Sequence, residues 1–262
     1  MENGNYNLIE SFEAIKKSIQ EADLVVVGLG EEWNVSPATQ TKACFARIQA
    51  DLAVNLEYRW LLPYFYYKLT DETLLKAYKE LFQLLEGKNY YVVATTVNRS
   101  FAPFVQNERF VMPCGSDVSM CDEVLSSSED YPEFIKSLDA YLNGEIGIQE
   151  IAFVRDEEGQ VVPFNNIYSS SYKEQGYLAK WSNYMKWLQG TMNRKTCLLE
   201  LGAGLQFPSV FRFPFEKMVY FNRKAMCFRV HKTLYHLTEE MAERSKSVPV
   251  HAVELFAGEV VE

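Results

Sequence analysis

Two short apolar runs that end in glycine constrain the fold of this 262-residue chain most strongly. One is ADLVVVGLG at 22–30, and the other is CLLELGAG at 197–204. Runs of valine and leucine with few polar residues are typical of parallel strands buried on both faces of a sheet. Glycine at the end of such a strand lets a ligand approach the bare backbone. The two runs therefore predict a parallel sheet with glycine corners at its carboxyl edge.

The remaining hydrophobic patterns alternate between helix and strand. Helices are expected over 8–21 (with Ser11 as an N-cap), 37–56, 71–89, 131–143, 173–190 and 235–245. Strands are expected over 22–30, 90–97, 109–114, 196–201, 217–221 and 225–230, with a hairpin over 150–170 that turns at Asp156–Gly159. This order predicts an α/β fold with a doubly wound parallel sheet. We expect one domain over 1–262, with a small lobe inserted at 115–172.

Composition favours a packed core and argues against two kinds of partner. Apolar residues make up 48% of the chain, with 17 Phe, 16 Tyr and 4 Trp, far more than a disordered chain would hold. The net charge of −9 argues against nucleic acid, which needs a basic surface. No run of 18 apolar residues predicts a membrane span, so no membrane partner is expected. The aromatic segment 57–70 is expected to line the core or a groove.

The cysteines predict a reduced, cytoplasmic environment. They are odd in number and scattered along the chain, at Cys44, Cys114, Cys121, Cys197 and Cys227. The first residues lack the basic and apolar segments of a signal peptide. Thiols in such a setting stay reduced, so we expect a cytoplasmic protein without disulfides.

The order of the motifs resembles that of the sirtuins, most closely the bacterial branch linked to macrodomains. The stretches that carry the resemblance are ADLVVVGLGEEW, LFQLLEGKN, YYVVATTVNR, LLELGAGLQFPSVFRFPFEKM and FNRKAMCFRVH. They cover nearly the whole chain in order, and the motif at 198–215 is the most specific. The resemblance implies a Rossmann-like domain with a small zinc lobe and NAD in the cleft between them. It also implies chemistry that cleaves the nicotinamide bond and passes ADP-ribose to an acyl-lysine or another acceptor.

This resemblance assigns the residues that would hold NAD or ADP-ribose. They are Gly28, Leu29, Gly30, Thr95, Thr96, Asn98, Gly202, Ala203, Gly204, Asn222, Val230 and His231. Glu31 and Glu32 directly follow the first glycine corner. Two unit charges about 5 Å apart repel by about 3 kcal/mol at an effective dielectric of about 20, so these carboxylates oppose a pyrophosphate unless they turn outward. Both glycine corners can therefore be nucleotide loops or turns kept for folding alone.

The positions that the resemblance assigns to catalysis are altered. Val97 stands where the family has a ribose-binding Asn, and Asn98 is one residue out of step. In MPCGSD at 112–117, Pro113 or Cys114 takes the place of the general base. The weak catalytic candidates are Asn98, Ser116 and Asp117, while the three histidines all follow the last nucleotide motif. Cys114 is expected to be a buried, inert thiol rather than a nucleophile.

The zinc ligands that the resemblance implies are also missing. Cys121 matches the first ligand, but the segment 151–162 contains no cysteine for the second pair. A structural zinc site needs four ligands, so we expect no metal, a degenerate zinc lobe and hairpin packing in its place.

Three hypotheses follow. The chain is a sirtuin-like protein that binds NAD or ADP-ribose but catalyses poorly or not at all. Alternatively, it is an active NAD-dependent deacylase or ADP-ribosyltransferase with a rearranged site, whose acceptor the sequence does not identify. The third hypothesis is a protein-interaction module that has lost its ligand.

Overall fold

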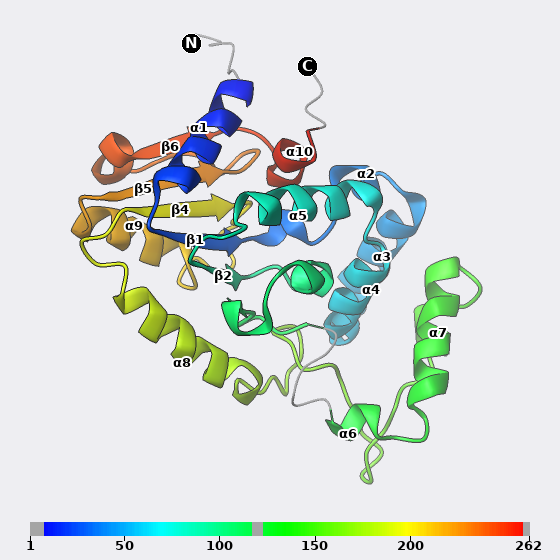
Figure 1. Ribbon diagram of the computed structural model, residues 1–262. Coiled ribbons are helices and arrows are strands. Elements are labelled where there is room, and N and C mark those ends of the chain that lie inside the picture. Colours follow the sequence, from blue (N-terminus) through cyan, green and yellow to red (C-terminus); the bar gives the residue numbers. More distant parts are fainter. Residues whose placement is uncertain (1–7, 117–122, 259–262) are drawn as a thin grey trace.

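A parallel six-stranded sheet forms the centre of the molecule (Figure 1). The structure is a computed structural model that describes residues 8–116 and 123–258. The strand order is β3-β2-β1-β4-β5-β6, so the order reverses between β1 and β4. The strands are β1 (Leu24–Leu29), β2 (Tyr90–Ala94), β3 (Phe110–Val111), β4 (Thr196–Leu201), β5 (Ala225–Val230) and β6 (Ser245–Val248). This is the doubly wound α/β architecture that the sequence predicts.

Helices cover both faces of the sheet (Figure 1). The described α-helices are α1 (Leu8–Glu21), α2 (Pro37–Gln40), α3 (Ala43–Val54), α4 (Leu62–Lys68), α5 (Glu72–Leu84), α6 (Glu123–Ser126), α7 (Tyr131–Asn143), α8 (Gln175–Gln189), α9 (Arg212–Phe221) and α10 (Ala252–Ala257). Short 3₁₀ segments include η1 (Glu31–Trp33), η2 (Leu56–Leu61), η3 (Arg99–Phe104), η4 (Asn107–Arg109), η5 (Ile148–Glu150) and η6 (Glu239–Arg244). No helix of the described residues is long and apolar enough to cross a membrane.

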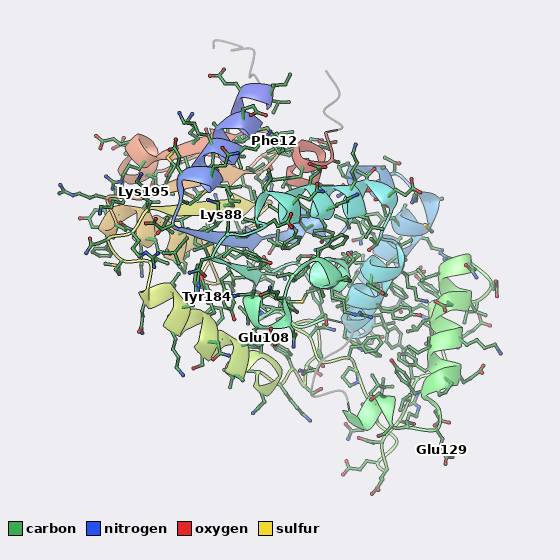
Figure 2. All side chains as sticks on the ribbon, in the orientation of Figure 1. Phe12, Lys88, Glu108, Glu129, Tyr184 and Lys195 are labelled. Carbon is green, nitrogen blue, oxygen red and sulfur yellow. The ribbon has the colours of Figure 1, made fainter. Side chains whose placement is uncertain are left out.

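The first of the two apolar runs contains no polar side chain within β1, because this strand is buried on both faces. Val25 and Val27 pack with α1, α5 and α10, whereas Val26 packs with α8 and α9. All six residues of β1 are buried, and side chains fill the space between the sheet and the helices (Figure 2). A strand with polar residues at alternate positions would leave one of these cores unfilled.

A third hydrophobic cluster lies outside the sheet. It joins the segment 35–69 to residues 114–164, and rings dominate it. Trp60 lies edge-on to Phe164 with ring centroids 5.5 Å apart, and Phe134 lies 5.6 Å from the same ring. The aromatic segment therefore contributes to a core, one of the two roles expected for it.

Several predicted elements differ from the structure. Residues 217–221 are the end of α9 rather than a strand, because Phe215 and Val219 are buried one helical turn apart. The expected helix at 235–245 is η6 followed by the edge strand β6. Ser11 lies inside α1, which already includes Leu8. The hairpin turns at Asp156–Gly159 as predicted, but its ladder has a single bridge, Arg155 to Val161.

Candidate functional site

The two predicted glycine corners meet at the carboxyl edge of the sheet. β1 and β4 are neighbours, with Leu29 opposite Leu201. The Gly30 N–H donates to the Leu201 carbonyl at 2.8 Å. A Cβ on Gly30 would lie 2.2 Å from the Gly202 carbonyl oxygen, so only glycine fits there. The prediction that both corners share one edge is confirmed.

Gly28 has a different reason to be glycine. It lies within β1, and a Cβ there would be 2.4 Å from the Phe211 ring. The ring packs directly on the strand backbone in a core where Phe211 is 1% exposed. This position therefore admits an aromatic ring rather than a phosphate.

The second corner requires a left-handed backbone. Gly202 has φ +68°, and its N–H donates to the Val230 carbonyl at 2.7 Å. The Ala203 carbonyl accepts a bond from the Arg212 guanidinium at 3.1 Å. The turn is thus held by the end of β5 on one side and by α9 on the other.

Both glutamates that follow Gly30 turn inward. Glu31 Oε2 accepts the Gly204 N–H at 2.5 Å. Glu32 Oε1 accepts the Lys232 N–H at 3.0 Å, and its Oε2 accepts the Ala252 N–H at 2.8 Å. The structure therefore corrects the alternative in which the carboxylates face outward. Free backbone N–H groups at strand ends and in turns are the donors that bind phosphates, and here the chain's own carboxyl groups accept three of them.

Burial perturbs the acid–base behaviour of this cluster. The Glu32 side chain is 9% exposed, and desolvation outweighs its two backbone bonds and raises its pKa to about 7. His231 Nδ1 accepts the N–H groups of Thr233 and Leu234, at 3.0 and 2.9 Å. Burial, helped by the Arg212 charge, lowers the pKa of His231 to about 4. His231 is therefore neutral at neutral pH, and its 3.4 Å approach to Glu32 is not an ion pair.

A buried ion cluster that the sequence analysis did not predict lies next to the second corner. Arg212 joins the two, because it contacts both Glu200 and the Ala203 carbonyl. Arg229 Nε lies 2.8 Å from Glu200 Oε1, and its other end reaches Glu216 at 2.8 Å. Arg212 lies 3.0 Å from the same Glu200 oxygen. The sequence feature that could have indicated this cluster is Glu200, the single glutamate within the apolar run of β4. It lies directly opposite Arg229 of β5. Two acids and two arginines make the cluster neutral, which burial requires.

The polar residues after β2 close the other side of the corner. The N–H groups of Thr95 and Thr96 donate to the Leu29 carbonyl at 2.8 and 3.1 Å. Asn98 is fully buried, and its Nδ2 donates to the Asn34 carbonyl at 2.9 Å and to Thr70 Oγ1 at 3.0 Å. Asn34, a second residue the sequence did not single out, accepts from Thr96 Oγ1 at 2.9 Å. Asn98 thus links the segment after β2 to Asn34, which follows η1, and to Thr70, which follows α4.

Three residues that the sequence analysis assigned to NAD or ADP-ribose do not direct their side chains to the glycine corners. The Leu29 and Val230 side chains are buried in the apolar core. Asn222 precedes β5, and its amide donates to the carbonyls of Thr191 and Arg194, at 2.9 and 3.0 Å. The six residues of β5 span about 20 Å, so Asn222 lies at the opposite edge of the sheet from the glycine corners.

Of the catalytic candidates, Asn98 lies beside the corners in the segment after β2. Ser116 is buried and lines a pocket beside α8. Asp117 lies outside the described residues, as does Cys121. Burial raises the pKa of the Cys114 thiol far above its usual range, which suits an inert core cysteine. Within 8–116 and 123–258, no group of three or more His, Cys, Asp or Glu residues could hold a metal ion.

These features place the chain in a structural class. No protein-family model matches it. Similar solved structures are Sir2 sirtuins: Sir2Tm bound to a propionylated peptide has a TM-score of 0.52 and 12% identity, and it covers 95% of this chain and 96% of its own. A complex of Sir2 with a p53 peptide and NAD⁺ gives the same values. The chain has the sirtuin fold.

A relative from Staphylococcus aureus (strain Mu50) is similar over most of the chain. It is named protein ADP-ribosyltransferase and is 21% identical over 276 residues, covering 89% of this chain and 82% of its own length.

Proposed function

We propose that this chain is a sirtuin-fold protein that does not turn over NAD, and in which Glu31 and Glu32 compete with a nucleotide of the NAD or ADP-ribose type. One observation carries the proposal. The two carboxylates accept the backbone N–H groups of Gly204, Lys232 and Ala252 at the edge where β1, β4 and β5 end. A pyrophosphate at this edge would need the same donors.

The effect of this competition on nucleotide affinity can be estimated from the charges. A nucleotide must either displace the carboxylates or lie beside them. Even one carboxylate charge about 5 Å from a pyrophosphate charge costs about 3 kcal/mol at an effective dielectric of about 20, which is about a hundredfold in affinity. We therefore expect the natural chain to bind NAD and ADP-ribose weakly.

Loss of turnover is supported by the positions around the site. Val97 offers no side-chain hydrogen bond to a ribose, and the Asn98 amide already bonds to the chain. Cys114 is a buried thiol with a strongly raised pKa. His231 is a neutral acceptor of two backbone N–H groups. None of these groups suits activation of a ribose hydroxyl.

The remaining parts of this proposal rest on the family resemblance and, for the location, on the scattered cysteines. We propose a small lobe at 115–172 that folds without zinc, a cytoplasmic location and kinship with the macrodomain-linked branch. The name of the S. aureus relative favours a second candidate function, ADP-ribose transfer with Asn98, Ser116 or Asp117 in a rearranged site. A protein-interaction role without ligand remains the third.

Calorimetric titration with NAD and ADP-ribose tests the proposal. The natural chain is compared with a Glu31→Ala/Glu32→Ser double variant, and urea unfolding establishes that the variant is folded. We expect the double variant to bind at least about tenfold more tightly, since the repulsion and the competing acceptors are both removed. Ligand at 100 times its dissociation constant should also raise the unfolding free energy by about 2.7 kcal/mol.

The matched control is Glu157→Ala/Glu158→Ser, an adjacent pair of exposed glutamates in the hairpin turn. It should bind as the natural chain does. Unchanged or weaker binding by the Glu31/Glu32 variant would contradict the proposal. Release of nicotinamide by the natural chain would favour the transferase instead.

A further inference from the structure

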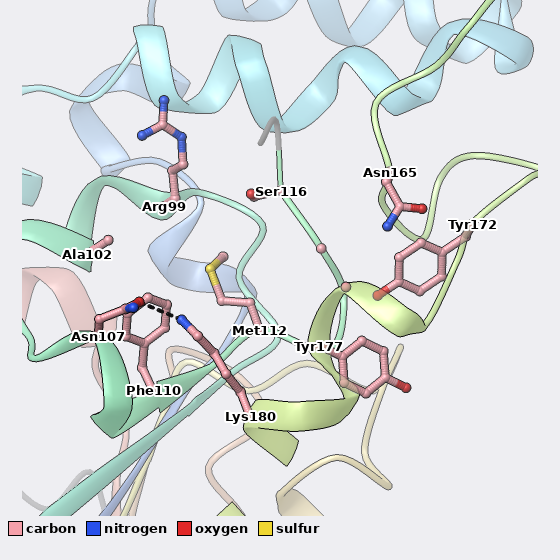
Figure 3. A pocket seen from close by; sticks show the side chains of 12 residues that line it. Arg99, Ala102, Asn107, Phe110, Met112, Ser116, Asn165, Tyr172, Tyr177 and Lys180 are labelled. Atoms are coloured by element: carbon pink, nitrogen blue, oxygen red, sulfur yellow. Dashed lines mark hydrogen bonds between the residues drawn. The ribbon is translucent and has the colours of Figure 1, made fainter. Parts of the chain in front are cut away.

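A pocket of about 430 Å³ lies between α8, β3 and the η3–η4 segment, and it shares no residue with the Glu31–Glu32 cluster (Figure 3). Ligand pockets range from about 300 to 1,000 Å³, so this one suits a compound of one or two rings rather than a dinucleotide. Its lining includes Ser116 but no residue of the glycine corners.

The charged residues that line this pocket are cationic. Within residues 8–116 and 123–258 they are Arg99 and Lys180, and no carboxylate of these ranges lines the pocket. This is unusual for a chain whose net charge is −9. The Arg99 guanidinium lies 4.1 Å from the Tyr67 ring centroid and points away from Lys180 (Figure 3).

Lys180 carries the charge that a ligand would meet. Its Nζ donates to Asn107 Oδ1 at 2.7 Å and lies 4.0 Å from the Phe110 ring centroid (Figure 3). An ammonium has three donors, and within the described part of the chain Asn107 is its one hydrogen-bond acceptor. Burial lowers the Lys180 pKa, partly offset by the charge of exposed Glu108, so the ammonium is partly desolvated. A desolvated cation gains most from an anion.

The opposite wall is aromatic and flat. Tyr172 and Tyr177 stack with ring centroids 6.5 Å apart and an angle of 19°. Tyr172 is fixed through its hydroxyl, which donates to the Pro113 carbonyl. Tyr177 and Lys180 are three residues apart on α8, so they share one face of the helix. Met112 lies between the two walls (Figure 3).

We propose that this pocket binds a small organic anion, with its negative group at Lys180 and a flat apolar body against Tyr177 and Met112. The size of the pocket suits a small ligand, Lys180 selects its charge, and the rings select a planar body. The site stands independently of the proposal for the glycine corners.

Two probes of nearly equal shape test this assignment. Naphthalene-2-sulfonate is an anion, and naphthalene-2-sulfonamide is neutral at pH 7. Calorimetric titration should show one sulfonate site on the natural chain and weaker binding of the sulfonamide. Lys180→Met should weaken sulfonate binding at least about tenfold while it changes sulfonamide binding by less than about twofold, because only the charge contact is lost.

Lys186→Met is the control, since Lys186 is an exposed lysine on the same helix. It should leave both probes unaffected. Tyr177→Ala should weaken both probes, because each loses the aromatic wall. Absence of sulfonate binding, equal loss for both probes in Lys180→Met, or sulfonate binding insensitive to Lys180 and Tyr177 would overturn the assignment.

Discussion

Glu32 and Gly202 are packed against each other at the carboxyl edge of the sheet. The Glu32 N–H donates to the Gly202 carbonyl at 3.1 Å, and a Cβ on Gly202 would lie 2.5 Å from the Glu32 Cβ. The corner after β1 and the corner after β4 therefore form one unit. A change at either residue is expected to affect the other.

The first prediction concerns this contact. Gly202→Ala should lower the unfolding free energy by about 2–4 kcal/mol, because the new Cβ meets both a left-handed backbone and Glu32. Gly87→Ala is the matched control, since Gly87 has φ +73° but nothing within 4 Å of an added Cβ. It should cost only about 1 kcal/mol. Urea denaturation measures both, and equal costs would show that the contact with Glu32 is unimportant.

The second prediction concerns pH. The pKa of Glu32 is raised from 4.5 to about 7, so the folded chain holds a proton at this site between those values that the unfolded chain has lost. The Glu32 contribution to stability therefore falls as pH rises from about 4.5 to 7, by at most about 3 kcal/mol. His231 and His251, whose pKa values are lowered to about 4, act in the opposite direction up to their unfolded value of 6.5.

Glu32→Gln isolates the effect of the glutamate. The unfolding free energy of the variant minus that of the natural chain should increase between pH 5 and pH 8, because Gln cannot ionise. Chemical denaturation at several pH values measures this difference. A difference independent of pH would show that Glu32 titrates normally.

The third prediction concerns the buried ion cluster. Arg229→Met leaves Glu200 with one arginine and gives the cluster a net negative charge, so the unfolding free energy should fall by about 3–5 kcal/mol. Adding Glu200→Met should restore much of that loss, because Arg212 and Glu216 remain as a neutral pair. The exposed pair Lys68–Asp139 is the control, and Lys68→Met should cost less than about 1 kcal/mol. A double variant as unstable as the single one would contradict the charge argument.

The fourth prediction concerns thiol reactivity. Among the described cysteines, Cys44 is partly exposed, whereas Cys114, Cys197 and Cys227 are buried with raised pKa values. Iodoacetamide at pH 8 should label Cys44 before these three, because labelling requires an accessible thiolate. Peptide mass spectrometry on the native protein measures the order. Rapid labelling of Cys114 would support a reactive role for it.

The sheet could be predicted from local pattern, but part of the helical layer could not. β1 and β4 were recognisable because burial on both faces demands continuous apolar residues. The segment 217–221 resembled a strand because Met218–Phe221 is apolar and aromatic, yet its burial follows a helical spacing that depends on the sheet beneath it. The edge strand Ser245–Val248 has a short, polar sequence and forms only because β5 offers a free edge.

The sequence by itself determined that β1 and β4 both end in glycine at one edge of the sheet, because parallel buried strands share their carboxyl edge. Only the tertiary structure decided what lies at that edge. The partners of Glu31 and Glu32 are backbone N–H groups of residues 204, 232 and 252, which are 173 to 220 positions away along the chain. The direction in which a carboxylate turns depends on which donors the fold brings within about 3 Å of it. Such donors carry no signature in the amino-acid sequence, because every residue except proline supplies the same N–H group.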